Sequence, residues 1–572
     1  MRMHHVTLLV AVLLFAVGAQ AATVSWSAND PTGEWTNGAN WSTGNPPGDS
    51  DLAYFAKTFD LEVNLGAADT VQDLRVNGSG NLTLSTDAAA SLTLRNLQNF
   101  NTTAVLTVDC GLLGKGGLTI RTASRTDEAV IINGPLLTGQ SDQLSLWATP
   151  AKIRIMGDNS ARGSGVTYLP KTSYLITGHQ YALGSDPSYM LINTGGYVAN
   201  EEVTLALDGA NLDYADHIRL YRDLKVRVYQ GDDDRTLNII GPAGSTSMLR
   251  GGTGAERLII DDNAGGGAGN LTVRFSAASP DTGTHTILKP IEVKAGNTLA
   301  FDSTNRDWQL RHYIGTIATP ATVSGAGRFL VEGTGTVLLN SDLTQTGGTD
   351  IDGGTLLIQE YDWGVGNGGV QTGTLAASGT TAVASGATLD LNGKDGDALG
   401  GQTIGGLAGE GTVLLGGATL RINEGVFAGA SPGTLTVDEA GFVVLNASAE
   451  SIFELDSLAA ASDQVVIPGA DLTLGGVLTV QNAGGLEAGD YTLFDLTAGT
   501  ISGSFSAVNM PSGFNGTIDT TSGDVVLEVT LSQLPGDTDG DGDVDINDLS
   551  TLASNWDQCG KTWADGDFTG DG

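Results

Sequence analysis

The stretch GAGRFLVEGTGTVLLNSDLTQTGGTDIDGGTLLI, residues 325–358, carries the clearest structural signal in the chain. It alternates apolar and polar residues in short runs that end in glycine, aspartate or asparagine. A period of two is typical of β-strands, because successive side chains point to opposite faces of a sheet. Glycine and Asx residues between such runs are typical of tight turns. The stretch therefore predicts short strands joined by turns.

The same rhythm extends outward from this stretch over residues 60–437, for example in IEVKAGNTLAF at 291–301. Strand-like runs recur roughly every 10 to 13 residues, which fits either a β-solenoid or a β-sandwich. The 82 glycines and the scarcity of helix-forming residues also favour a mainly β protein. With 40% hydrophobic residues, the chain can bury a long core.

Three repeated elements within 325–358 identify a family resemblance: G-x-G before a strand, T-G-G-T, and x-x-G-T-L before the next strand. Together they resemble the autotransporter-associated β-strand repeat. Residues 384–393 (ASGATLDLNG) and 404–422 (IGGLAGEGTVLLGGATLRI) look like further coils, and 427–437 (FAGASPGTLTV) resembles the turn that ends such arrays. The resemblance implies a right-handed parallel β-helix over residues 60–437, in which each coil buries its apolar face against its neighbours.

The N-terminus has the pattern of an export signal. A short basic start precedes the apolar run Leu8 to Val17, and Ala19-Gln20-Ala21 is a small-x-small cleavage site. We therefore expect residues 1–21 to be a bacterial Sec signal and the mature protein to be secreted, extracellular or held at the cell surface. The alternative, a membrane anchor, is disfavoured because ten apolar residues are too few to cross a bilayer. No other stretch is long and apolar enough, so no transmembrane segment is expected.

Residues 22–59 contain three tryptophans, Trp26, Trp35 and Trp41. Exposed tryptophans could stack on sugar rings, whereas buried ones could cover the open end of a repeat domain. We predict an N-terminal cap. Beyond the repeats the strands lengthen, so residues 438–530 are predicted to form a separate antiparallel cap or small β domain. Residues 531–536 are predicted to be a linker.

An acidic segment, GDTDGDGDVDINDL, occupies residues 536–549 of a chain that already carries a formal net charge of −38. Such a run should repel itself unless a cation gathers it, and the alternative is a solvated acidic linker. Its spacing matches the Ca²⁺-binding EF-hand loop, which uses positions 1, 3, 5, 7, 9 and 12 and a glycine at position 6. Gly542 takes position 6. The predicted Ca²⁺ ligands are Asp537, Asp539, Asp541, Asp543 (through its backbone carbonyl), Asp545 and Asp548.

A helix is predicted directly after this loop. DLSTLASNW, residues 548–556, places Leu549, Leu552 and Trp556 on one helical face. One helix after a loop with aspartate at position 12 resembles the type I dockerin repeat. That resemblance implies docking onto a cohesin-like protein or another cell-surface component, with Ile546 and Asn547 in the partner-reading positions.

Dockerins have two such repeats, and the second begins at GDFTGDG, residues 566–572. Asp567, Thr569 and Asp571 would be its ligands at positions 1, 3 and 5. The sequence stops at position 6, so residues 537–572 are expected to form a dockerin-like calcium module with an incomplete second repeat.

Several other functions are disfavoured. Strong acidity opposes nucleic-acid binding, which needs lysine and arginine. The two cysteines, Cys110 and Cys559, provide no disulfide framework. The G-x-S-x-G at residues 429–433 places Pro432 after the serine, and proline has no N–H to donate to an oxyanion. The four histidines after the signal are scattered, so zinc is not expected.

The main enzymatic alternative is a β-helix polysaccharide lyase or glycoside hydrolase. QGDDDR (230–235) and TGHQ (177–180) echo pieces of the polygalacturonase pattern, but they occur in reverse order and the N-T-D and R-I-K pieces are missing. Asp232 and Asp233 with Asp261 and Asp262 could supply two carboxylates, yet such pairs are usually turn residues. A carbohydrate-binding protein is the other alternative. We predict a secreted structural or adhesive β-solenoid anchored through its C-terminal calcium module.

Overall fold

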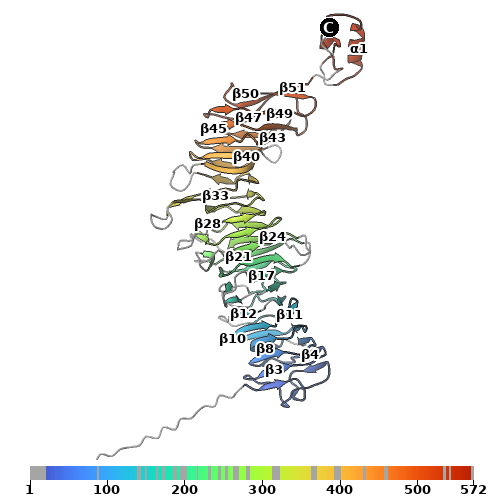
Figure 1. Ribbon diagram of the computed structural model, residues 1–572, viewed down its shortest axis with the longest axis vertical. Helices are drawn as coiled ribbons and strands as arrows, with labels where there is room; N and C mark the ends of the chain where they lie inside the picture. Colours follow the sequence, from blue (N-terminus) through green and yellow to red (C-terminus); the bar gives the residue numbers. More distant parts are fainter. Residues whose placement is uncertain are drawn as a thin grey trace, which may run out of the picture. The chain divides into compact units, whose positions relative to one another are not determined.

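The protein is mainly β, with long sheets of parallel strands consistent with a β-solenoid (Figure 1). The computed structural model describes residues 21–86, 89–137, 143–147, 151–162, 165–170, 174–184, 190–193, 203–215, 217–229, 233–242, 247–251, 256–261, 269–278, 284–311, 322–362, 370–391, 401–428, 433–456, 462–532, 536–539 and 543–567. The chain forms two compact units. Unit 1 comprises residues 1–175 and 181–185, and unit 2 comprises residues 176–180 and 186–572.

Unit 1 is built from two stacks of parallel strands. Stack A contains β1 (Thr23–Ser25), β3 (Leu52–Phe55), β6 (Asp73–Val76), β8 (Ser91–Asn99), β10 (Gly111–Thr122), β12 (Leu144–Trp147) and β14 (Thr167–Pro170), and β5 (Asp69–Thr70) also pairs with β8. Stack B contains β2 (Thr32–Glu34), β4 (Leu61–Asn64), β7 (Leu82–Ser85), β9 (Leu106–Val108), β11 (Glu128–Ile132) and β13 (Lys152–Ile155). Strand β15 is Tyr174–Thr177. The chain alternates between the two stacks as it advances.

Unit 2 has three stacks of strands. Stack C is β16 (Met190–Asn193), β19 (Ile218–Leu220), β22 (Ser247–Gly251), β25 (Thr284–Ile287), β28 (Asp307–Arg311), β31 (Thr336–Asn340), β33 (Thr355–Ile358), β37 (Thr388–Asp390), β39 (Thr412–Leu414), β41 (Thr434–Asp438), β44 (Gln464–Val466) and β47 (Gly489–Asp495). Stack D is β17 (Val203–Leu207), β20 (Leu224–Val228), β23 (Leu258–Ile260), β26 (Ile291–Val293) and β29 (Val323–Gly325).

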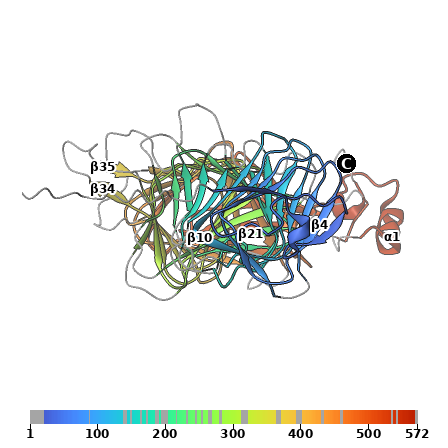
Figure 2. The same ribbon diagram turned by 90° about the horizontal axis from the view of Figure 1, so that it is seen from below.

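Stack E is β18 (Leu212–Tyr214), β21 (Arg235–Gly241), β24 (Leu271–Ala277), β27 (Thr298–Asp302), β30 (Arg328–Glu332), β32 (Thr349–Ile351), β36 (Thr380–Val383), β38 (Gly401–Gly409), β40 (Thr419–Ala428), β42 (Phe442–Leu445), β43 (Glu450–Leu455), β45 (Asp471–Leu474), β46 (Val477–Asn482), β48 (Ile501–Gly503) and β49 (Ala507–Asn509). A short antiparallel hairpin, β34 (Glu360–Asp362) with β35 (Val370–Thr372), projects from these stacks (Figure 2).

The alternation that predicted the strands also builds the core. In β30 and β31, Phe329, Val331, Val337 and Leu339 are fully buried while the residues between them face outward. Inward side chains in neighbouring coils stack on each other, as the rings of Phe275 and Phe301 do at 5.2 Å between centroids. Because each coil covers the apolar side chains of the next, the buried core continues from coil to coil along the stack.

The G-x-G element of the repeat has a steric cause. Gly325 has φ +106°, and a Cβ there would lie 2.1 Å from the Val293 carbonyl oxygen of the preceding coil. Gly409 repeats this arrangement with φ +108° and 2.1 Å to the carbonyl oxygen of Val383. Only glycine combines this backbone conformation with such a close approach. The glycines of the repeat therefore lie at corners where the backbone of one coil comes close to the backbone of the preceding coil.

The tryptophans near the N-terminus are buried rather than exposed. Trp26, Trp35 and Trp41 have 3%, 0% and 2% of their surface exposed, and the Trp41 ring packs edge-on against both others at 5.0 Å. The ring of Phe55 joins the cluster. Buried rings cannot stack on sugars, so these residues contribute packing to the first coils of unit 1.

The antiparallel part near the C-terminus is shorter than the predicted range 438–530. Parallel pairing continues through β45–β48 and β46–β49. Antiparallel pairing joins β47 to β51 (Val525–Leu531) and β50 (Phe514–Asp519) to β51. The inward residues of β42 and β45, such as Val443 and Leu472, keep the alternating burial of the preceding coils, so these strands continue stack E. Among the described residues, no helix has both the length and the apolar character needed to span a membrane.

Candidate metal centre

The acidic segment leads into α1 (Ile546–Asn555), and the structure describes it at residues 536–539 and 543–549. The helix begins two residues before the predicted start, and Trp556 is its C-cap. Asp545 is the N-cap, and its side chain accepts a hydrogen bond from the backbone N–H of Asn547 at 2.7 Å. Such a cap satisfies an N–H group that has no partner within the helix.

Asp548 joins the two ends of the loop. Its Oδ1 accepts the backbone N–H of Thr538 at 2.6 Å, and its Oδ2 accepts that of Asp545 at 2.6 Å. The Thr538 hydroxyl also reaches Oδ1, at 3.2 Å. These N–H donors, first that of Asp545 and then that of Thr538, hold the pKa of the Asp548 carboxyl below its usual range. The carboxylate is therefore fixed in its charged form beside the start of the loop.

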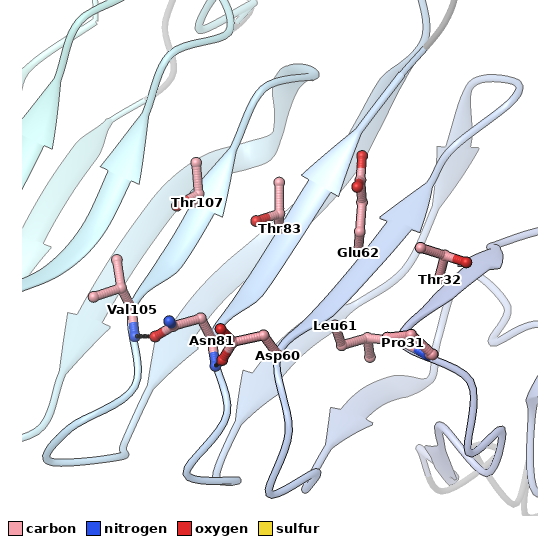
Figure 3. A pocket seen from close by; sticks show the side chains of 9 residues that line it. All are labelled: Pro31, Thr32, Asp60, Leu61, Glu62, Asn81, Thr83, Val105 and Thr107. Atoms are coloured by element: carbon pink, nitrogen blue, oxygen red, sulfur yellow. Dashed lines mark hydrogen bonds between the residues drawn. The ribbon is translucent and has the colours of Figure 1, made fainter.

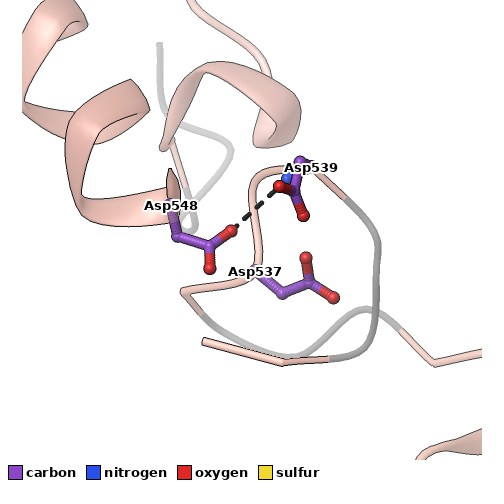
Figure 4. A group of neighbouring side chains, drawn as sticks. All are labelled: Asp537, Asp539 and Asp548. Atoms are coloured by element: carbon purple, nitrogen blue, oxygen red, sulfur yellow. Dashed lines mark hydrogen bonds between the residues drawn. The ribbon is translucent and has the colours of Figure 1, made fainter. Parts of the chain in front are cut away.

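Three carboxylates converge at this point. One oxygen from each of Asp537, Asp539 and Asp548 lies within 4.8 Å of the others, and Figure 4 shows the three side chains arranged around a common space. Asp537 and Asp548 are only 4% and 2% exposed, whereas Asp539 is open to solvent. Burying like charges together is costly unless a positive charge offsets them. The grouping therefore favours cation binding.

The donor atoms fit a hard divalent cation. All three side chains offer oxygen, the ligand that Ca²⁺ and Mg²⁺ prefer, and none offers nitrogen or sulfur. Oδ2 of Asp548 accepts one backbone N–H and keeps a lone pair for a metal, whereas Oδ1 accepts the backbone N–H groups of Thr538 and Asp539 and the Thr538 hydroxyl. The position of Asp548 is thus set by the fold rather than by the ion. The three described carboxylates therefore form a group of oxygen donors that could hold a divalent cation.

The other predicted ligands have different positions. Asp543 is exposed, and Asp545 caps the helix with the carboxylate that was assigned to position 9. Asp541, Thr569 and Asp571 lie outside the described residues, as does Gly542. Asp567 follows the short 3₁₀ helix η3 (Trp563–Asp565), and its backbone N–H donates to the carbonyl of Thr562.

Two contributors were not identified from the sequence. Thr538 supplies two of the hydrogen bonds that hold Asp548. The indole Nε1 of Trp563 donates to the backbone carbonyl of Asp537 at 3.2 Å, so the segment after α1 folds back onto the first loop. The spacing Asp545-x-x-Asp548 is a capping-box pattern and could have revealed the cap. No spacing rule indicates the contact of Trp563.

The surface of α1 carries exposed apolar side chains. Ile546, Leu549 and Trp556 are 70%, 57% and 72% exposed. Leu552 instead lies against Gly566, where an added Cβ would come within 2.7 Å of its Cδ1. Of the helical face predicted from these residues, Leu552 therefore packs internally, whereas Leu549 and Trp556 face solvent.

A shallow pocket of about 400 Å³ lies on stack B of unit 1 (Figure 3). Thr32, Glu62, Thr83 and Thr107 stand side by side on β2, β4, β7 and β9. At its edge, Asp60 Oδ1 accepts the backbone N–H of Asn81 at 2.9 Å, and Asn81 Oδ1 accepts that of Val105 at 2.8 Å. Asp60 thus links successive coils.

The residues considered for catalysis take part in ion pairs where they are described. Asp233 pairs with Arg235 at 3.0 Å, and Asp261 lies 3.9 Å from both Lys225 and Arg227. Asp232 and Asp262 lie outside the described residues. Of the four aspartates, the two that the structure describes therefore each lie beside cationic side chains.

Comparison of the chain with protein-family models and with curated proteins finds no match.

Proposed function

We propose that the protein is an exported structural or adhesive β-solenoid, tethered to a partner through a C-terminal Ca²⁺-binding loop and helix. The convergence of the Asp537, Asp539 and Asp548 carboxylates carries this proposal. A bound Ca²⁺ would supply the positive charge that offsets these carboxylates. The export signal and the right-handed course of the coils are parts of the proposal that rest on the sequence pattern.

Asp548 would act as the central ligand. Because it joins Thr538 and Asp545 through hydrogen bonds, an ion held by this carboxylate would fix the loop and the first turn of α1 together. Ile546, Leu549 and Trp556 then present apolar side chains on an ordered helix. We propose that this surface contacts a cohesin-like protein or another cell-surface component.

Terbium luminescence in the full-length protein tests the calcium site. Tb³⁺ replaces Ca²⁺ at oxygen sites, and the Trp563 indole, bonded to the Asp537 carbonyl, is placed to sensitise its emission. We expect sensitised emission that Ca²⁺ displaces with an affinity of about 0.1–1 mM, typical of extracellular modules. Trp563→Phe should remove most of the emission while leaving Ca²⁺ binding, measured by calorimetry, in place.

Two variants separate a specific site from general acidity. Asp548→Asn should weaken Ca²⁺ binding more than about tenfold, because it removes a ligand charge at the centre of the cluster. Asp557→Asn makes the same charge change at an exposed residue just after α1 and should have little effect. Equal losses in both variants, or emission that Ca²⁺ cannot displace, would contradict the proposal.

A further inference from the structure

One outward surface of unit 1 carries two arginines beside aromatic side chains. Strand register places Tyr54, Arg75, Gln98, Arg121 and Trp147 in a column across β3, β6, β8, β10 and β12 of stack A. The residues just before them, such as Leu74, Ile120 and Leu146, are buried in the core. The column lies on the outward side of the strands, where Arg121 is exposed, Tyr54, Arg75 and Trp147 are half-buried and Gln98 is buried, and we call the surface around it the A face.

The two arginines of the A face have no carboxylate partner among the described residues. Arg75 donates from Nε to the side-chain oxygen of Gln98 at 2.9 Å, and its guanidinium lies 5.4 Å from the ring centre of Phe100. Arg121 is exposed, and its guanidinium lies 5.3 Å from the ring centre of Trp147. Cation–π contact leaves the N–H edges of a guanidinium available for an anion.

Several other described cations pair with carboxylates. In unit 2, Arg257 contacts Asp223 at 3.0 Å and Glu292 at 2.6 Å, and Arg274 contacts Glu332 at 2.9 Å. A chain with net charge −38 has ample carboxylates to pair with each arginine. On the A face, Arg75 and Arg121 contact rings and an amide instead, which leaves guanidinium N–H groups that an anionic ligand could meet.

Polar and aromatic groups fill the adjacent column of the A face. Asn96, Thr119, Ser145 and Tyr168 follow one another in register on β8, β10, β12 and β14. The Tyr168 ring meets that of Trp147 edge-on at 6.3 Å. The one carboxylate in this column, Asp73, accepts a hydrogen bond from the Asn96 side chain at 2.5 Å. The surface thus combines ring faces, hydroxyls and amides with two guanidinium groups.

We propose that the A face binds a carboxylated polysaccharide, a chain of uronic acid residues laid across the strands. The guanidinium groups of Arg75 and Arg121 can each hold a carboxylate through paired N–H donors. The rings of Trp147 and Tyr168 can pack on the apolar faces of sugars, and Thr119 can exchange hydrogen bonds with sugar hydroxyls.

Strand spacing suits a repeating ligand. Neighbouring strands lie about 4.8 Å apart, the length scale of one pyranose ring, so successive sugars can meet successive coils. This inference is independent of the calcium module, since the A face belongs to unit 1.

Affinity electrophoresis and calorimetry with polygalacturonate as the probe test the proposal on the full-length protein. EDTA is present throughout, so that Ca²⁺ can neither gel the polymer nor occupy the C-terminal loop. We expect binding to polygalacturonate that weakens with salt, and none to its fully methyl-esterified form. Dextran sulfate and polyglutamate serve as a sulfated polysaccharide and an acidic peptide.

Matched variants locate the contact. Arg121→Gln should weaken polygalacturonate binding about tenfold, because it removes a charge-assisted hydrogen-bonding group from an exposed position. Trp147→Ala should weaken binding without changing its salt dependence. Arg154→Gln, which makes the same charge change on stack B, should leave binding within about twofold. Thermal unfolding of each variant is measured to verify folding.

Four results would overturn the proposal. They are equal losses in Arg121→Gln and Arg154→Gln, equal binding of the methyl ester, and binding of dextran sulfate or of polyglutamate as tight as that of polygalacturonate. Failure here would leave the calcium site untouched, because no step of this test uses Ca²⁺.

Discussion

At the scale of single residues, Asp548 shows how one side chain can prepare a metal site. Its two oxygens accept N–H groups from opposite ends of the loop, so the loop is closed by hydrogen bonds that need no ion. The same bonds keep the pKa of this carboxyl low, with Asp545 as the main donor. A side chain that stays charged and in place reduces the entropy lost when a cation binds.

The position of Asp548 in the loop could be predicted from its spacing, but its hydrogen bonds could not. Sequence spacing states which residues can reach a common ion. It does not state that Thr538 and Asp545 supply the donors, since those contacts depend on how the backbone closes. Trp563 is a clearer case, because it reaches Asp537, which lies 26 positions earlier in the chain.

The two cysteines should differ sharply in reactivity. Cys110 is buried, and desolvation raises the pKa of its thiol to about 12, with a smaller contribution from the Asp109 charge. Its thiolate is therefore scarce at pH 7 to 9, whereas Cys559 is exposed. We expect one thiol per native chain to react rapidly with Ellman's reagent and the second only after unfolding.

Cys559→Ser provides the control for this labelling. The variant should show no rapid phase, and raising the pH from 7 to 9 should not expose a second reactive thiol in the native protein. Rapid modification of Cys110 in native Cys559→Ser would show that the coil around it opens readily.

At the scale of strands and turns, alternation and glycine spacing predicted short strands joined by turns, and the structure is mainly β. The pattern in 328–332 predicts which residues are buried, and β30 has that pattern. Alternation cannot say which stack a strand joins, because a strand obeys the same period in any sheet. For the same reason it did not predict that β45 and β46 would continue the parallel pairing.

Glycine variants test whether the corners of the coils fix the repeat. Gly325→Ala would place a Cβ 2.1 Å from the Val293 oxygen and requires φ +106°, so we expect a loss of more than about 3 kcal/mol. Gly386→Ala, with φ +79° and open space around it, should cost only about 1–2 kcal/mol. Chemical denaturation of both variants measures the difference.

The comparison is informative because both positions have positive φ. If the two variants lose equal stability, the positive φ alone explains why glycine is required at these positions. The close approach of neighbouring coils at Gly325 would then add no further destabilisation. A larger loss at Gly325 would show that the crossing itself constrains the sequence.

At the scale of the whole chain, stability should be divided between parts that need a cation and parts that do not. Among the described residues, one group of acidic, histidine or cysteine side chains could hold a metal ion, and it consists of Asp537, Asp539 and Asp548. The stacks of units 1 and 2 are held by inward apolar side chains and by backbone pairing between neighbouring coils. In such stacks each coil depends mainly on its neighbours, so a change at one end need not spread.

Hydrogen exchange followed by mass spectrometry measures this division directly. At 10 mM Ca²⁺, a site with a dissociation constant of about 0.1–1 mM gains protection of about tenfold to a hundredfold by mass action. We expect that gain in amides of 543–556, because the ion fixes the loop and the start of α1 together. Amides of β30 and β31 should exchange equally in Ca²⁺ and in EDTA, and Asp548→Asn should abolish the gain in 543–556 alone. If EDTA accelerates exchange in the stacks as strongly as in α1, then a cation supports the coils themselves and the division between the two parts is wrong.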